Sequence, residues 1–136
     1  MTIRWLRLMG AALVAEAVPI ALLVGLVAAL GPTDPEAAQA FASRWGTWVG
    51  PIGGAIATFL LAIWVARPLA AGHAVHGGLL GLFVAVLDAA LLVVGASAFE
   101  WLFVISGAGR IVAGLLGGYL ASKIGTGSGR GEAKGY

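Results

Sequence analysis

Cysteine is absent from this chain of 136 residues. A protein without thiols forms no disulfide and builds no thiolate metal site, which excludes both as sources of stability. Charge is also scarce, since only 10% of the residues are Asp, Glu, Lys or Arg, against about 25% in ordinary soluble domains. So few charged groups cannot cover a surface that faces water, and the composition excludes an ordinary soluble domain.

Hydrophobic residues are abundant instead, at 60% of the chain, and the mean hydropathy is +1.00. A transmembrane helix needs about 20 mostly apolar residues. Four stretches meet this requirement, at residues 8–30, 48–66, 77–98 and 101–122. The length suits a single domain. We therefore expect an all-α integral membrane protein whose four transmembrane helices form one antiparallel bundle over residues 1–124.

Two segments outside these stretches have signatures of their own. The sequence TDPE, with Thr33 or Asp34 as cap and Pro35 in the first turn, is typical of a helix start. It predicts a short interfacial helix over residues 35–45. Residues 125–136 are Gly-rich and polar and lack apolar periodicity, so they predict a disordered tail.

The basic residues divide unequally between the two sides of the predicted bundle. Arg44 lies alone on one side, and the other side holds Arg4, Arg7, Arg67, Lys123, Arg130 and Lys134. Cytoplasmic segments of membrane proteins carry the excess of Lys and Arg. We therefore expect both termini to be cytoplasmic, in the cytoplasmic membrane of a bacterium or an archaeon.

Asp88 and Arg110 lie deep within the third and fourth apolar stretches, eleven residues on either side of Phe99. If the chain turns at Phe99, a rise of about 1.5 Å per residue puts both roughly 16 Å below the turn. A lone charge at the bilayer centre costs about 2.5–3.5 kcal/mol on insertion scales. We expect the two residues to form a buried ion pair, which either fixes the packing of the two helices or belongs to a transport or binding site.

Glu16 lies within the first stretch, roughly 14 Å from its basic end by the same rise per residue. It either joins Asp88 around Arg110 or stays protonated and bonds to a neighbouring helix, because burial disfavours the charged form. Pro19 follows one turn later and predicts a kink, since proline frees the carbonyl of residue 15. We expect Glu16, Asp88 and Arg110 to form a proton, ion or substrate site.

Glycines recur at a four-residue spacing within the apolar stretches. Small residues at this spacing let transmembrane helices approach closely. The pairs are Gly50 with Gly54, Gly77 with Gly81, and Gly114 with Gly118. We expect all six to pack helices together, and the alternative for GPIGGA at 50–55 is an unwound entry to a cavity.

Metal, cofactor and nucleic-acid chemistry find little support in the sequence. His73 and His76 have no nearby carboxylate or cysteine as a third ligand, so we expect no metal site and no cofactor. Asp88 lies about 18 Å from His76 along a helix. At this distance the two cannot act together as a catalytic acid and base, so we expect no enzyme. Because the basic residues lie at the ends of apolar stretches, their expected partner is the lipid bilayer and not nucleic acid.

Ala15-Glu16 within a first span, in a short chain with four spans, resembles the small multidrug resistance transporters. In that family a glutamate of the first helix binds substrate and protons, a role that the resemblance places on Glu16. The later aromatic- and glycine-containing motifs of that family are not evident in this chain, and Arg110 within the membrane departs from its pattern.

Two functions remain for such a protein. The first is a small transporter or channel-like protein coupled to protons or cations, in which Glu16 titrates and Asp88 and Arg110 shape the site. The alternative is a non-catalytic accessory or scaffold subunit whose buried charges specify helix pairing. A bundle this small encloses little space, so we expect a homo-oligomer or a place in a larger membrane complex.

Overall fold

The computed structural model describes residues 4–94 and 101–125, and these residues form four helices. Helix α1 spans Trp5–Leu30, α2 spans Pro35–Ala66, α3 spans His73–Val94 and α4 spans Trp101–Gly125. Each is long and apolar enough to cross a membrane, which confirms the predicted all-α membrane fold. The predicted turn around Phe99 and the predicted tail beyond Gly125 lie outside the described residues.

Helix α2 is longer than the second apolar stretch, because it begins at Pro35. The side chain of Asp34 accepts a hydrogen bond of 2.9 Å from the N–H of Ala37, and Pro35 stands in the first turn, where a missing N–H costs nothing. Residues 35–45, predicted as a short interfacial helix, form the first part of α2. No proline interrupts the chain between residues 36 and 50, so the helix continues into the apolar stretch.

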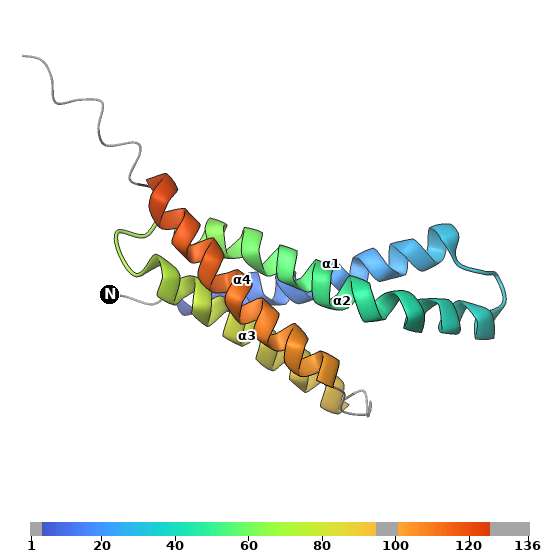
Figure 1. Ribbon diagram of the computed structural model, residues 1–136. Coiled ribbons are helices and arrows are strands. Elements are labelled where there is room, and N and C mark those ends of the chain that lie inside the picture. Colours follow the sequence, from blue (N-terminus) through green and yellow to red (C-terminus); the bar gives the residue numbers. More distant parts are fainter. Residues whose placement is uncertain (1–3, 95–100, 126–136) are drawn as a thin grey trace, which may run out of the picture.

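The helices form two hairpins, α1 with α2 and α3 with α4 (Figure 1). We call the end of the bundle where α1 begins and α4 finishes the terminal end, and the end where residues 31–34 join α1 to α2 the loop end. Helix α4 packs against α3 and α2, and α1 packs against α2 and α3. Among the described residues α1 and α4 do not pack directly against each other.

Most buried residues lie in the half of the bundle nearer the terminal end. They lie within residues 8–19, 54–66, 76–84 and 106–121. Toward the loop end the two hairpins diverge (Figure 1), and side chains such as Val94 are exposed, this one at 84%. The protein core therefore occupies one half of the bundle, and the diverging halves offer apolar surface to lipid or to another protein.

Glycines bring α3 and α4 into close contact. A Cβ added at Gly77 would overlap the carbonyl oxygen of Gly114, and one added at Gly114 would overlap that of Gly77. Gly81 likewise faces the backbone of Arg110, and Gly118 faces the backbone of His73. These four predicted packing glycines thus lie at the crossing of α3 and α4, where backbone meets backbone.

Candidate functional site

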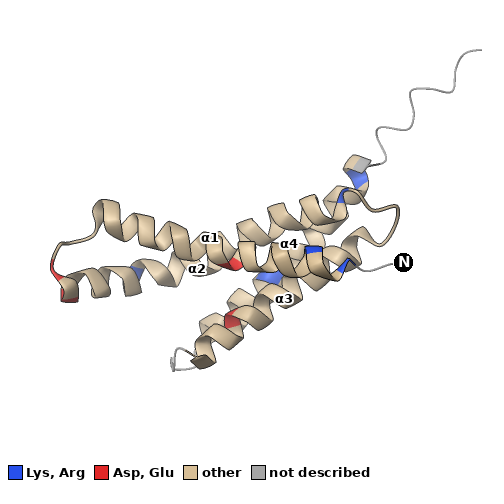
Figure 2. Ribbon diagram, turned by 180° about the vertical axis from the view of Figure 1, so that it is seen from behind, with Lys and Arg blue, Asp and Glu red and all other residues tan. Residues whose placement is uncertain are grey.

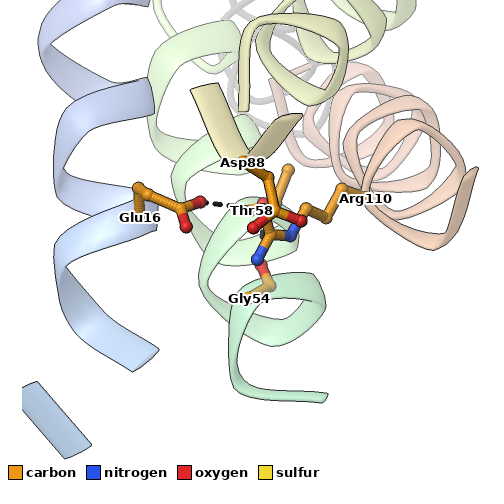
Figure 3. Close-up of polar contacts among 5 residues, drawn as sticks. All are labelled: Glu16, Gly54, Thr58, Asp88 and Arg110. Carbon is orange, nitrogen blue, oxygen red and sulfur yellow. Dashed lines mark hydrogen bonds and ion pairs between the residues drawn. The ribbon is translucent and has the colours of Figure 1, made fainter. Parts of the chain in front are cut away.

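Three ionisable side chains from three helices meet inside the bundle (Figure 3). Arg110 Nη1 on α4 donates a hydrogen bond of 2.8 Å to Glu16 Oε2 on α1, a length typical of charge-assisted bonds. Asp88 Oδ2 on α3 lies 3.0 Å from the same nitrogen. We call Glu16, Asp88 and Arg110 the carboxylate–arginine cluster. The predicted ion pair between Asp88 and Arg110 is present, and Glu16 joins it.

The three members of the cluster differ in exposure. The side chain of Arg110 is 2% exposed, that of Glu16 11% and that of Asp88 18%. Asp88 lies one turn beyond Val84, the last buried residue of α3, and so at the point where the hairpins begin to diverge. The cation is therefore sealed within protein, while the carboxylates form the more accessible edge of the cluster.

Helix α2 completes the site without adding a charge. A Cβ at Gly54 would lie 2.7 Å from both Nε and Nη2 of Arg110, so a larger residue at this position would displace the guanidinium. One turn later Thr58 is fully buried, and its hydroxyl donates a 2.7 Å hydrogen bond to the carbonyl of Gly54 (Figure 3). Its hydroxyl hydrogen is thereby used within α2, and Gly54 and Thr58 form the wall behind the guanidinium.

Sequence reasoning assigned Gly54 to helix packing and did not single out Thr58. The available signal was the polar Thr58 one turn after a glycine in an apolar span. Gly50, the partner of Gly54 in the predicted pair, behaves differently, since a Cβ there would meet nothing within 4 Å. The close packing predicted for Gly50 is therefore absent from the described residues, because this turn of α2 lies toward the diverging half of the bundle.

The charges of the cluster do not balance when both carboxylates are ionised. Two carboxylates and one guanidinium then carry one net negative charge. A charge without a partner costs free energy where water is excluded, because it loses its solvation. One added proton or one monovalent cation would make the cluster neutral.

Pro19 lies one turn from Glu16 and is buried against α2. A Cβ at Gly53 would lie 3.5 Å from Pro19 Cβ, and α1 remains helical through the proline. Because proline lacks an N–H, the carbonyl of Ala15 has no partner within the helix. The residue that carries the carboxylate therefore adjoins a carbonyl that lacks its usual helical donor, and the kink predicted at Pro19 stays a prediction.

The two histidines lie away from the cluster, near the terminal end. His76 is buried, with Nδ1 3.0 Å from the carbonyl oxygen of Gly72, and His73 is the first residue of α3. In the part of the chain that the structure describes, no group of three or more His, Cys, Asp or Glu side chains is arranged to hold a metal ion.

Comparison with known proteins returned no matching family model, no matching curated protein and no matching solved structure. Function is therefore inferred from the site itself. The sequence and the structure together establish a small membrane protein with four candidate spans, whose helices meet at ion pairs of the buried Arg110.

Proposed function

We propose that this protein is a small transporter or channel-like protein that moves a proton or a small cation across the membrane through the carboxylate–arginine cluster. The observation that carries the proposal is the second carboxylate. One carboxylate is enough to neutralise a buried arginine, yet Glu16 and Asp88 both lie within 3.0 Å of Arg110 Nη1. Ionisable groups that are retained within a membrane at such cost commonly mark ion pathways.

The shape of the bundle supports access to the cluster from the loop end. On the side toward the terminal end, the core residues Leu8, Leu80 and Val65 are each at most 1% exposed. On the other side the hairpins diverge (Figure 1), and Asp88 is the most exposed member of the cluster. A proton or cation that enters from the loop end meets a carboxylate before it meets the guanidinium.

Glu16→Gln is the direct test, because it keeps the shape of the side chain and leaves one carboxylate for one arginine. The protein is placed in liposomes with an internal pH indicator, and the decay of an imposed pH gradient is followed with potassium or sodium as counter-ion. We expect flux to fall about tenfold or more, the effect of losing about 1.4 kcal/mol at the site. Glu36→Gln, an exposed carboxylate at the start of α2, is the matched control and should leave flux unchanged.

Equal flux in the wild type and in Glu16→Gln would refute the proposal. An alternative function, an accessory or scaffold subunit, is supported by the apolar surface of the diverging halves, where side chains such as Val93 and Val94 are largely exposed. It requires flux no greater than that of empty liposomes, together with co-purification of a larger membrane protein. Wild-type flux above that background, from protein that purifies without a partner, would reject the scaffold.

We also propose that the terminal end faces the cytoplasm. Arg4, Arg7, Arg67 and Lys123 lie at this end, and Arg44 lies with Asp34 and Glu36 toward the loop end (Figure 2). This distribution is the one expected when the basic end stays on the cytoplasmic side.

Because the chain has no cysteine, single cysteines report on this orientation cleanly. Thr33→Cys at the loop end should react with a membrane-impermeant maleimide added to intact cells. Ala70→Cys, between α2 and α3 at the terminal end, should react only after the membrane is permeabilised. The opposite labelling pattern would reverse the orientation.

A further inference from the structure

A groove on the lipid-facing side of α1 and α2 lies at the terminal end, away from the carboxylate–arginine cluster. Its volume is about 470 Å³, and its walls include Arg7, Gly10, Ala11, Leu61 and Trp64. We propose that this groove binds an anionic phospholipid, with the phosphate against Arg7 and an acyl chain along the apolar wall.

The guanidinium of Arg7 is held in place at the polar end of the groove. Pro68 has no N–H, so the carbonyl of Trp64 one turn earlier lacks its helical partner. Arg7 Nη2 donates a hydrogen bond of 3.0 Å to that carbonyl, and the guanidinium carbon lies 4.1 Å from the centre of the Trp64 ring. A guanidinium has five N–H donors, so N–H groups that do not bond to Trp64 remain to bind a phosphate. Because the guanidinium is already held, it fixes where the phosphate binds.

The rest of the groove suits a hydrocarbon chain. Apart from Arg7, its walls are the apolar residues of one face of α1 together with Leu61 and Trp64 of α2. Gly10 is one of the lining residues, and a Cβ at Gly10 would meet nothing within 4 Å, so the absence of a side chain there leaves space that no other protein atom fills. Tryptophan beside the basic residue is typical of the boundary between acyl chains and headgroups.

Charge at this end of the bundle favours an anionic headgroup over a zwitterionic one. Arg4, Arg7, Arg67 and Lys123 lie near the terminal end, and in residues 4–94 and 101–125 every Asp and Glu lies either in the cluster or near the loop end (Figure 2). A net negative lipid is therefore attracted to the rim of the groove, while no described carboxylate at this end repels it.

Native mass spectrometry of the full chain in detergent, with dioleoyl phosphatidylglycerol or dioleoyl phosphatidylcholine added at equal concentration, tests the assignment. We expect the wild type to retain phosphatidylglycerol preferentially, and Arg7→Gln to reduce that preference about fivefold, the effect of one basic residue at an anionic surface. The matched control is Arg4→Gln, which removes the same charge from an exposed arginine one turn earlier that does not line the groove, and which should reduce the preference less.

Gly10→Leu tests the acyl-chain part of the groove independently, and it keeps the proposal falsifiable if Arg7→Gln fails to fold. The larger side chain should weaken retention of both lipids while Arg7 is intact. Glycerol 3-phosphate, which has a phosphate and no acyl chain, should not displace the bound lipid. Equal retention of the two lipids by the wild type, an equal loss in Arg4→Gln and Arg7→Gln, or full retention by Gly10→Leu would each overturn the proposal.

Discussion

Arg110→Met is expected to lower the free energy of unfolding by about 3–5 kcal/mol, the usual cost of removing one partner from a buried ion pair. The loss of stability comes from the carboxylates that the substitution leaves without a partner. Glu16 and Asp88 both contact Arg110 Nη1, so its removal leaves two carboxylates close together in a largely dry site. Unfolding by titration with sodium dodecyl sulfate in mixed micelles, followed by circular dichroism, measures the loss.

Recovery by further substitution identifies the origin of this loss. Adding Glu16→Gln and Asp88→Asn to Arg110→Met removes the stranded charges, so the triple variant should regain part of the lost stability. Adding Asp88→Asn alone should regain less, because Glu16 still lacks a partner. Arg44→Met, at an exposed position on α2, controls for the general effect of replacing arginine. Full recovery by Asp88→Asn alone would show that Glu16 is not coupled to Arg110.

Gly114→Ala is expected to destabilise the bundle by about 1–3 kcal/mol or more, as overpacking of a filled interior does. A Cβ at Gly114 would overlap the carbonyl oxygen of Gly77 and lie 3.1 Å from the backbone nitrogen of Gly81. These neighbours are helix backbone, which cannot rotate away as a flexible side chain does, so α3 and α4 must separate. The same unfolding titration measures this effect.

Gly109→Ala is the matched control for Gly114→Ala, because it makes the same change in the same helix. A Cβ at Gly109 would meet nothing within 4 Å. Alanine in a helix interior is favoured over glycine by roughly 0.5–1 kcal/mol, so this variant should be as stable as the wild type or more stable. Two losses of equal size would show that the contact between α3 and α4 does not govern the result, because a Cβ at Gly109 makes no such contact.

The carboxylate–arginine cluster is also the place where all four helices are linked. Arg110 of α4 contacts Glu16 of α1 and Asp88 of α3, and its guanidinium lies against Gly54 of α2. Helices α1 and α4 do not otherwise pack together among the described residues. A change in protonation at Glu16 would therefore act directly on a side-chain contact between these two helices, which connects the proposed transport chemistry to the arrangement of the hairpins.

Local properties of the chain were enough to predict the four spans. Long apolar runs with few charges form spanning helices whatever their neighbours are, because the thickness and low polarity of the bilayer act on each helix separately. The ion pair of Asp88 with Arg110 was predictable for a similar reason, since a short connection between two helices sets the relative depth of their residues.

Only the tertiary structure shows which carboxylates bind the guanidinium of Arg110. The sequence left Glu16 either joined to Asp88 around Arg110 or protonated against a neighbouring helix, because α1 is distant from α4 in the chain and no spacing rule relates them. Gly50 and Gly54 have the same spacing as the other glycine pairs, yet only Gly54 meets Arg110. The difference arises because the hairpins diverge between these two turns of α2, and such divergence depends on how separate helices pack and not on the pattern within any one of them.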